Sequence, residues 1–488
     1  MTRNPRQLRR TVAAFVALGA ALGVAACSVN PATGKRQLVL IGESQEISLG
    51  RDANEDIVRQ YGVYEDEALQ GFVADLGARL AATSERPDLP WTFQVVDDPV
   101  VNAFALPGGF IYVTRGILAH LESEAGLAGV LGHEIGHVTA RHGASQMSRG
   151  LLAQIGLGVG SVVSPEIAAV AGLAQSGVGL LFLKYGRDDE RQADDLGARY
   201  AERAGYDPRA MVEVFEVLER SSRRAGSGSS LPGWLSTHPA PEARQERARE
   251  ALADRGDLDR LRRDRESYIA RLDGLVYGAD PREGYFVEDR FLHPELAFEL
   301  RFPAGWGHRN ERNGVLSREP DGRALVLLTL AAEATAEEAR DVFAATDGIT
   351  VLGGWREKIG GRPVESVRFR GESGDTVTRG FVAFLEHEGR VLRLLGTAAD
   401  AAFPAVESTM AESLSSFRRV RDREILEVEP LRIRVETLRR PTTPSELAAS
   451  YDAPVDAEVL AVLNNVEVDE SMAAGIAVKK VTGRKPPG

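Results

Sequence analysis

Three of the chain's eight histidines fall within residues 130–143, which read VLGHEIGHVTARHG. His133 and His137 are four positions apart, so on a helix their imidazoles lie on one face, one turn from each other. Glu134 projects about 100° around the helix, within reach of a water held by the two rings. This is the H-E-x-x-H pattern, in which two imidazole nitrogens bind zinc and the carboxylate acts as a general base. The segment therefore predicts a zinc hydrolase site.

The residues around this motif have the spacing of one helix over 122–150, with acidic side chains in its first turn. Its interior residues are small and apolar, which indicates a buried helix rather than a polar surface. His142 comes five positions after His137 and projects about 140° away from the ligand face. We therefore expect His142 to be structural or to support a ligand.

A catalytic zinc needs a third protein ligand and keeps its fourth position for water. Gly143 stands where the metzincin pattern has its third histidine, so the ligand must come from elsewhere. Residues 185–208, YGRDDERQADDLGARYAERAGYDP, predict a second helix with an acidic first turn. On this helix Glu190 can bind the metal while Asp194, on the same face, accepts a ring N–H from a ligating histidine. Asp189 and Asp194 remain alternative ligands.

The two segments together resemble the gluzincin metallopeptidases of the HtpX and CAAX-prenyl-protease type, in their periplasmic BepA-like lipoprotein branch. Three further stretches agree: residues 30–50, residues 101–118 (VNAFALPGGFIYVTRGIL) and residues 236–247 (STHPAPEARQER). The resemblance covers residues 30–250. It implies a mainly helical zincin domain with a small β-sheet and one zinc ion.

The same resemblance assigns roles to individual residues. It implies that the zinc ligands are His133, His137 and Glu190, and that Glu134 is the base. Asp194 is then expected to orient a ligand, and Arg244 to anchor the site. His238 is expected to face the zinc, as a catalytic hydrogen-bond donor or as a plug on the metal in a resting state.

The chemistry expected of such a site is peptide hydrolysis. Zinc lowers the pKa of its water to about 7 and polarises the scissile carbonyl, and Glu134 carries the proton to the leaving amine. Residues 102–113, NAFALPGGFIYV, predict two short strands about a Pro-Gly-Gly turn. An exposed edge there would pair with an extended peptide, and the candidates for substrate binding are Asn102, Ala103 and Phe104. The alternative is a hairpin that only supports the zinc helix.

The N-terminus predicts the compartment. Residues 1–27 consist of a basic start, an apolar stretch of small residues and the sequence VAAC, which is typical of a signal peptide. The ending resembles a bacterial lipobox, which implies lipidation of Cys27, the only cysteine, and attachment to a membrane, with Ser28 favouring the outer membrane. Loss of the four arginines before Cys27 changes the formal charge from −12 to −16. This acidic balance disfavours nucleic acid and anionic membrane surfaces as partners.

The length and pattern predict a multi-domain chain. After the signal peptide (1–27) we expect the zincin domain (28–280), an α+β domain (284–420) with a faint PsbP-like resemblance, and a βααβ module (425–483) that resembles LysM. A LysM module implies peptidoglycan as a partner; residues 441–444, PTTP, replace its usual Gly-Asp-Thr, so a docking scaffold is the alternative. Residues 150–183 carry one charged residue and predict a helical pair over the catalytic helices.

Two functions follow from these patterns. The first is a zinc endopeptidase, lipid-anchored on the periplasmic side of the envelope, that cleaves misfolded or unassembled envelope polypeptides. The second is a non-proteolytic assembly or cell-wall-binding protein built on a zincin fold. Glu134 discriminates between them, because a protein that only binds does not need this carboxylate.

Overall fold

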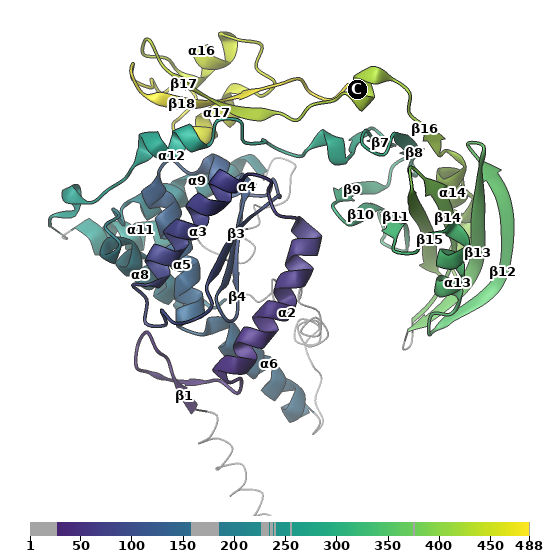
Figure 1. Cartoon of the computed structure of the whole chain (residues 1–488), viewed down its shortest axis with the longest axis horizontal. Coiled ribbons are helices and arrows are strands. Elements are labelled where there is room, and N and C mark those ends of the chain that lie inside the picture. Colours follow the sequence, from purple (N-terminus) through teal and green to yellow (C-terminus); the bar gives the residue numbers. More distant parts are fainter. Residues whose placement is uncertain are drawn as a thin grey trace, which may run out of the picture. The chain divides into compact units, whose positions relative to one another are not determined.

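The computed structural model describes residues 27–157, 185–225, 234, 238, 241–253, 256–373 and 376–487. The chain divides into two compact units (Figure 1). The first contains the described residues up to Gly278 together with residues 432–482, and the second contains residues 279–431 and 483–487. The predicted signal peptide and most of the predicted helical pair at 150–183 lie outside the described residues.

The first unit is mainly helical and has a small three-stranded sheet. In this sheet β5 is central, parallel to β3 and antiparallel to β4, so β4 forms an edge. The helices are α2 (Glu43–Tyr61), α3 (Glu67–Ala81), α4 (Arg115–His120), α5 (Glu124–Thr139), α6 (His142–Leu157), α8 (Arg187–Arg203), α9 (Ala210–Ala225), α11 (Pro241–Ala253), the 3-10 turn η2 (Leu258–Arg260) and α12 (Arg265–Arg271). The strands are β1 (Cys27–Val29), β2 (Arg36–Leu38), β3 (Thr92–Val96), β4 (Ala103–Leu106) and β5 (Phe110–Thr114).

Helix α5 carries the H-E-x-x-H motif and is buried along its whole length. Ser123 caps its N-terminus by accepting a hydrogen bond from the backbone N–H of Gly126. Helix α8 packs very closely against it, because a Cβ atom on Gly132 would lie 2.9 Å from the carbonyl oxygen of Gly197. Glycine at both positions therefore brings the two helix backbones, and the side chains that they carry, to short range.

The single helix predicted for residues 122–150 is in fact two helices, α5 and α6. The break falls at Arg141, whose φ of 58° lies in the left-handed region. Its side chain donates to Glu46 and to the carbonyl oxygen of Ile41, more than ninety residues away in sequence. Periodicity within the segment cannot reveal this break, because distant residues hold it in place.

The C-terminal segment folds against the first unit. Its strand–helix–helix–strand order, predicted from sequence, is confirmed by β17 (Arg432–Thr437), α16 (Pro444–Ala449), α17 (Ala457–Leu463) and β18 (Ala477–Thr482). Lys479 of β18 is fully buried, and its Nζ donates to the carbonyl oxygens of Ala119 (3.0 Å) and Leu121 (2.9 Å) and pairs with Glu122 (2.7 Å). The module thus contacts the turn that leads into α5.

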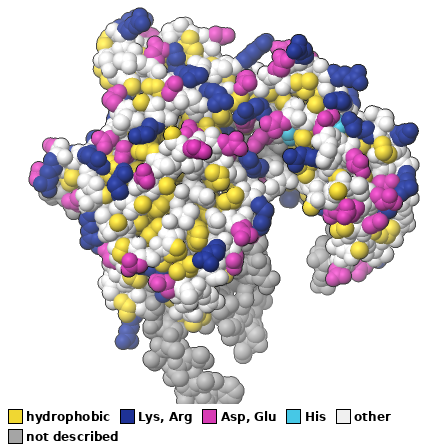
Figure 2. All heavy atoms as spheres, viewed as in Figure 1, with side chains coloured by type: hydrophobic (Ala, Val, Ile, Leu, Met, Phe, Trp, Pro, Cys, Tyr) yellow, Lys and Arg dark blue, Asp and Glu magenta, His cyan; other side chains and the backbone are white. Residues whose placement is uncertain are grey.

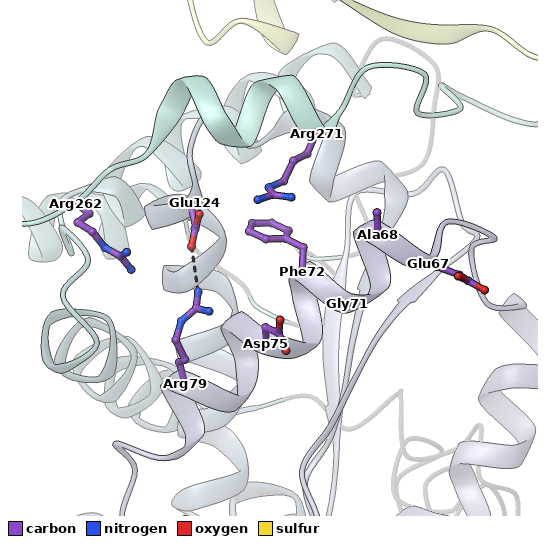
Figure 3. Close-up of a pocket in the computed structure, with 9 residues that line it drawn as sticks. All are labelled: Glu67, Ala68, Gly71, Phe72, Asp75, Arg79, Glu124, Arg262 and Arg271. Atoms are coloured by element: carbon purple, nitrogen blue, oxygen red, sulfur yellow. Dashed lines mark hydrogen bonds and ion pairs between the residues drawn. The ribbon is translucent and has the colours of Figure 1, made fainter.

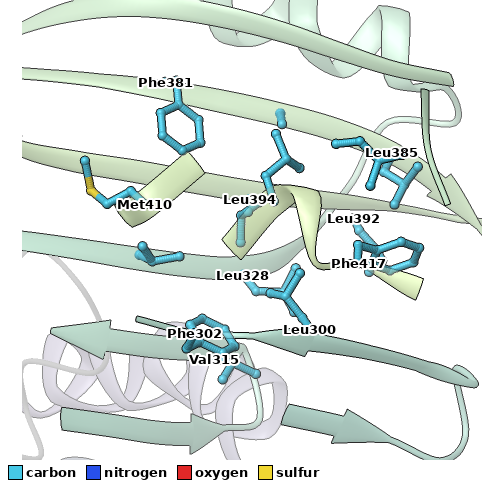
Figure 4. Packing of buried hydrophobic residues seen from close by; sticks show 14 of the residues in the cluster. Leu300, Phe302, Val315, Leu328, Phe381, Leu385, Leu392, Leu394, Met410 and Phe417 are labelled. Carbon is cyan, nitrogen blue, oxygen red and sulfur yellow. The ribbon is translucent and has the colours of Figure 1, made fainter. Parts of the chain in front are cut away.

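The second unit is rich in β-strands and also contains helices, and it includes the residues for which an α+β domain is predicted. A seven-stranded antiparallel sheet has the order β12-β13-β14-β15-β11-β10-β9, and a four-stranded sheet has the order β16-β8-β7-β6. Apolar residues from strands and from α14 form one core, including Leu328, Leu394, Met410 and Phe417 (Figure 4). The elements are η3 (Pro281–Glu283), β6 (Tyr285–Val287), β7 (Arg290–His293), β8 (Phe298–Arg301), β9 (Gly307–Glu311), β10 (Gly314–Arg318), β11 (Ala324–Ala331), α13 (Ala336–Ala344), β12 (Ile349–Ile359), β13 (Arg362–Ser373), β14 (Thr376–His387), β15 (Arg390–Ala399), α14 (Phe403–Ser415), β16 (Arg418–Arg419) and α15 (Arg423–Leu426).

The surface carries both signs of charge. Figure 2 shows basic and acidic side chains interspersed over the visible face, without one large field of a single sign. Among the helices that the structure describes, none combines the length and the apolar character that a membrane crossing requires.

Candidate metal centre

Four buried side chains of the first unit converge on one point. They are His133, His137, Glu190 and His238, and one donor atom from each lies within 4.8 Å of the others. The Nε2 atoms of His133 and His137 are 3.0 Å apart, and Nδ1 of His238 lies 3.3 Å from Nε2 of His133 and 2.9 Å from Oε1 of Glu190. Glu190 lies 3.5 Å from Nε2 of His137 and 3.7 Å from Nε2 of His133.

These separations match a tetrahedral zinc site. Zinc–nitrogen bonds of 2.0–2.1 Å place neighbouring donors about 3.3 Å apart at the corners of a tetrahedron. Nδ1 of His133 lies 3.0 Å from Oδ1 of Asp194, which fixes the proton on Nδ1 and leaves a lone pair on Nε2. Lone pairs of buried nitrogens that face one another and a carboxylate need a cation between them. The donor set therefore fits Zn²⁺.

Asp194 and Arg244 hold the ligands from behind. Asp194 lies one turn after Glu190 on α8 and accepts from Nε and Nη2 of Arg244 at 2.9 and 2.6 Å. Nη1 of Arg244 lies 2.8 Å from Oε2 of Glu190. Burial alone would raise the pKa of both carboxyls, but the adjacent Arg244 and histidine groups lower the pKa of each overall. Both acids therefore remain ionised.

His137 is held from two other directions. Its Nδ1 lies 2.9 Å from Nδ1 of His142, the first residue of α6, and the ring of Tyr185 stacks on its imidazole at 3.9 Å between centroids. Burial, followed by the positive potential of the neighbouring histidines, lowers the pKa of His137 and keeps it neutral, the form that binds a metal. His142 reaches this position because the chain turns at Arg141.

Glu134 and His238 face each other across the site. Oε1 of Glu134 lies 3.6 Å from Nε2 of His238, and within the described residues neither carboxylate oxygen of Glu134 has a hydrogen-bond partner. Burial raises the pKa of Glu134. For His238, burial alone would lower the pKa, but the carboxylates of Glu190 and Glu134 raise it overall. A buried carboxylate with open acceptor positions is suited to take a proton from a water beside it.

The proposed peptide-binding edge lies beside the site. Strand β4 contacts α5 and has no partner on its outer side among the described strands. The backbone N–H of Thr114 donates to the carbonyl of Asn102, so the antiparallel alternation directs Phe104 toward β5 and Ala103 toward the outer edge. The ring of Phe104 is buried and stacks on Tyr112. Of the three predicted residues, only Ala103 directs its backbone groups away from β5, and Ala103 is itself fully buried.

Other predicted residues lie outside the cluster. Asp189, the alternative ligand, instead accepts from the N–H of Gly186 and caps α8. Residue 27 begins β1, but its side chain is outside the described set. Sequence reasoning missed Tyr185 and also Trp234, which is fully buried with its ring 4.8 Å from that of His238. Trp234 precedes His238 by four residues, and that spacing is the only signal that could have indicated it.

Comparison with known proteins shows what part of this chain is similar to. Residues 67–252 match the family described as Peptidase family M48. The beta-barrel assembly-enhancing protease of Yersinia pestis is 34% identical over 200 residues, which cover 38% of this chain and 39% of that protein. The mitochondrial metalloendopeptidase OMA1 of Arabidopsis thaliana is 38% identical over 167 residues, covering 34% of this chain and 32% of that one.

The match spans less than half of the length of each of these two relatives. Among solved structures, cyanobacterial PsbP from Synechocystis aligns with 28% of this chain and 95% of its own length, at 14% identity and a TM-score of 0.23. This score is too low to establish a shared fold, so the PsbP-like assignment of residues 284–420 stays a prediction.

A hollow of about 600 Å³ lies away from the four clustered donors, between α3, the start of α5 and α12 (Figure 3). Arg79 pairs with Glu124 at 3.1 Å, and Arg271 lies over the ring of Phe72 at 4.5 Å. Acidic and basic side chains line it together. It offers none of the four donors of the metal centre.

Proposed function

We propose that this protein is a zinc-dependent endopeptidase of the bacterial cell envelope that hydrolyses misfolded or unassembled envelope polypeptides. The observation that carries the proposal is the set of four buried side chains whose donor atoms all lie within 4.8 Å of one another. Zinc bound there supplies a polarised carbonyl and an acidified water. One ion per chain satisfies the donors.

The chain's own residues then divide the work. His133, His137 and Glu190 bind the ion, and Asp194 and Arg244 fix the ligand orientations. Glu134 takes a proton from the attacking water and returns it to the leaving amine. The outer side of β4 at Ala103, which is covered in this structure, would have to open to align an extended peptide by backbone hydrogen bonds, a mode that depends little on side chains.

His238 occupies the fourth corner of the donor set. A catalytic zinc keeps that position for water, so with His238 in place the site is a closed, resting arrangement. When the imidazole withdraws, its Nε2, now 3.6 Å from Glu134, is within reach of the developing oxyanion. We therefore propose both roles for His238 in succession, first as a plug and then as a hydrogen-bond donor.

Zinc content and casein cleavage, measured together, test the peptidase proposal. Glu134→Gln is expected to retain one zinc and lose turnover by at least about a thousandfold. Glu246→Gln, an exposed carboxylate on α11, is the matched control and should behave as the wild type. If Glu134→Gln cleaves casein at the wild-type rate, Glu134 is not the base and the binding-protein hypothesis gains ground.

The location is a separate proposal. The lipobox-like VAAC sequence supports lipidation of Cys27 and attachment to the periplasmic side of the outer membrane. Palmitate labelling of the wild type and of Cys27→Ser tests it, since label that persists in the variant excludes this anchor. Binding of residues 425–483 to peptidoglycan is likewise proposed, and a pull-down with purified sacculi tests it.

A further inference from the structure

The hairpin directly after Cys27 is joined to the end of the catalytic helix. Strands β1 and β2 pair antiparallel, with Cys27 opposite Leu38. The side-chain amides of Asn30 and Gln37 both donate to the carbonyl oxygen of Ala140, at 3.3 and 3.1 Å. Ala140 is the C-cap of α5, where helix carbonyls lack partners within the helix. The hairpin therefore caps the helix that carries His133 and His137.

Further bonds make this junction specific. The N–H of Leu40 donates to Oγ of Ser148 at 2.9 Å, and Nη2 of Arg141 donates to the carbonyl of Ile41 at 2.6 Å. Ser148 and Asn30 are both buried. The chain from 30 to 41 is thus fastened to residues 140–148 at several independent points, and it cannot move without moving the end of α5.

The outer side of the hairpin has the composition of a membrane-contact surface. Val29 is 56% exposed and Leu40 is 39% exposed, and these are two of the three large apolar side chains of the first unit that are exposed among the described residues. Lys35 and Arg36 are exposed on the same hairpin and form no ion pair with any residue that the structure describes. Apolar side chains beside unpaired cations suit the boundary between lipid headgroups and acyl chains.

We propose that the β1–β2 hairpin rests on an anionic lipid surface and holds the C-terminal end of α5 toward the bilayer. The proposal rests on the lipidation of Cys27 proposed above. Two residues separate Cys27 from Asn30, and the three steps along the chain span at most about 10 Å. An acylated Cys27 therefore brings the hairpin to the headgroups, where each of two cations strengthens partitioning about fivefold. The net acidic charge of the chain disfavours anionic membranes in general, and the two unpaired cations of the hairpin offset this locally.

The orientation of the domain follows from the length of α5. Its sixteen residues extend about 24 Å from the hairpin end. The opposite end of α5 begins at Glu124, which accepts a hydrogen bond from Tyr206. Arg209 follows Tyr206 by three residues and pairs with the exposed Asp259, which places Asp259 near this end. Leu40 is thus expected at the lipid surface and Asp259 in the aqueous phase, well beyond the headgroups.

Spin labels can test this orientation, because Cys27 is the only cysteine and the proposed lipid would block its thiol. Leu40→Cys and Asp259→Cys are each labelled with a nitroxide in the full chain, bound to vesicles of phosphatidylethanolamine and phosphatidylglycerol. The Leu40 label is expected to collide mainly with oxygen, and the Asp259 label mainly with a water-soluble nickel complex. Equal access of the nickel complex to both labels overturns the proposal.

Charge reversal provides the second arm. The double variant Lys35→Glu/Arg36→Glu is expected to expose the Leu40 label at least about tenfold more to nickel while the acylated protein stays on the vesicles. Arg260→Glu, in the exposed η2 turn, is the matched control and should leave the label protected. A Leu40 label that stays protected after the double reversal removes the electrostatic part of the proposal.

Casein cleavage separates this proposal from the peptidase proposal. The hairpin variants are expected to cleave casein in detergent at the wild-type rate. A variant that loses contact with vesicles but keeps this rate shows that the hairpin contributes to membrane contact and not to peptide hydrolysis. If Cys27 is not acylated, a Leu40 label that is still protected by vesicles supports the surface without the anchor. An exposed Leu40 label in that case overturns it.

Discussion

The replacement Asp194→Asn isolates the contribution of an orienting carboxylate to metal binding. Asp194 is mostly buried and accepts from His133 at 3.0 Å and from Arg244 at 2.6 and 2.9 Å. Its lowered pKa keeps it ionised, so both bonds are charge-assisted. Charge-assisted hydrogen bonds contribute about 1.5–3 kcal/mol and neutral ones about 1 kcal/mol. The asparagine is therefore expected to weaken zinc binding by about 1–2 kcal/mol, or about five- to thirtyfold.

The assay is competition for zinc with a fluorescent chelator at neutral pH. The matched control is Asp195→Asn, the next residue of α8, whose carboxylate is 51% exposed and pairs with Arg247 at the surface. Exposed pairs of this kind contribute little, so its zinc affinity should be that of the wild type. The reasoning is refuted if Asp194→Asn binds zinc within about twofold of the wild type, or if the control weakens equally.

Three further predictions concern stability, and urea unfolding measures all of them. Glu46 is 1% exposed and accepts hydrogen bonds from Arg86 and Arg141, so Glu46→Gln should lower the free energy of unfolding by about 3 kcal/mol. The control is Glu43→Gln, which changes an exposed carboxylate and should leave the free energy of unfolding unchanged. Equal losses in the two variants would exclude a buried ion pair at Glu46. Lys479→Met should also cost about 3 kcal/mol, far more than Lys480→Met on the same strand, and a smaller loss would show that the C-terminal module is held by packing alone. Burial lowers the pKa of His120 from 6.5 to about 4. The buried neutral imidazole therefore contributes fully to the free energy of unfolding above pH 6.5, and this contribution is lost as the pH falls toward 4. The stability difference between pH 7.5 and pH 5 should shrink by about 2 kcal/mol in His120→Gln, and an unchanged pH profile would exclude this titration.

The catalytic pattern could be predicted because its geometry is local. On any helix the spacing of His133 and His137 places both on one face, and the same rule pairs Glu190 with Asp194 on α8. The sequence also indicated the α+β character of the second unit and the order of elements in the C-terminal module, since hydrophobic periodicity reports strands and helices directly.

Features that depend on distant residues could not be predicted in this way. The break between α5 and α6 requires Arg141 to bond with Glu46, and the stacking of Tyr185 on His137 requires α5 and α8 to lie side by side. In the sequence Lys479 resembles a surface lysine. In the structure it is buried and donates to the carbonyl oxygen of Leu121, a residue 358 positions earlier in the chain.

The sequence by itself predicted the chemistry that we propose for this protein, because side-chain type and helical spacing indicate metal ligands, a base and an orienting acid. Only the tertiary structure decided that His238 joins the donor set, that Ala103 rather than Phe104 directs its backbone away from β5, and that the hairpin after Cys27 caps α5. The physical reason is that these arrangements arise from packing between segments far apart in the chain, and no local pattern records which segments meet.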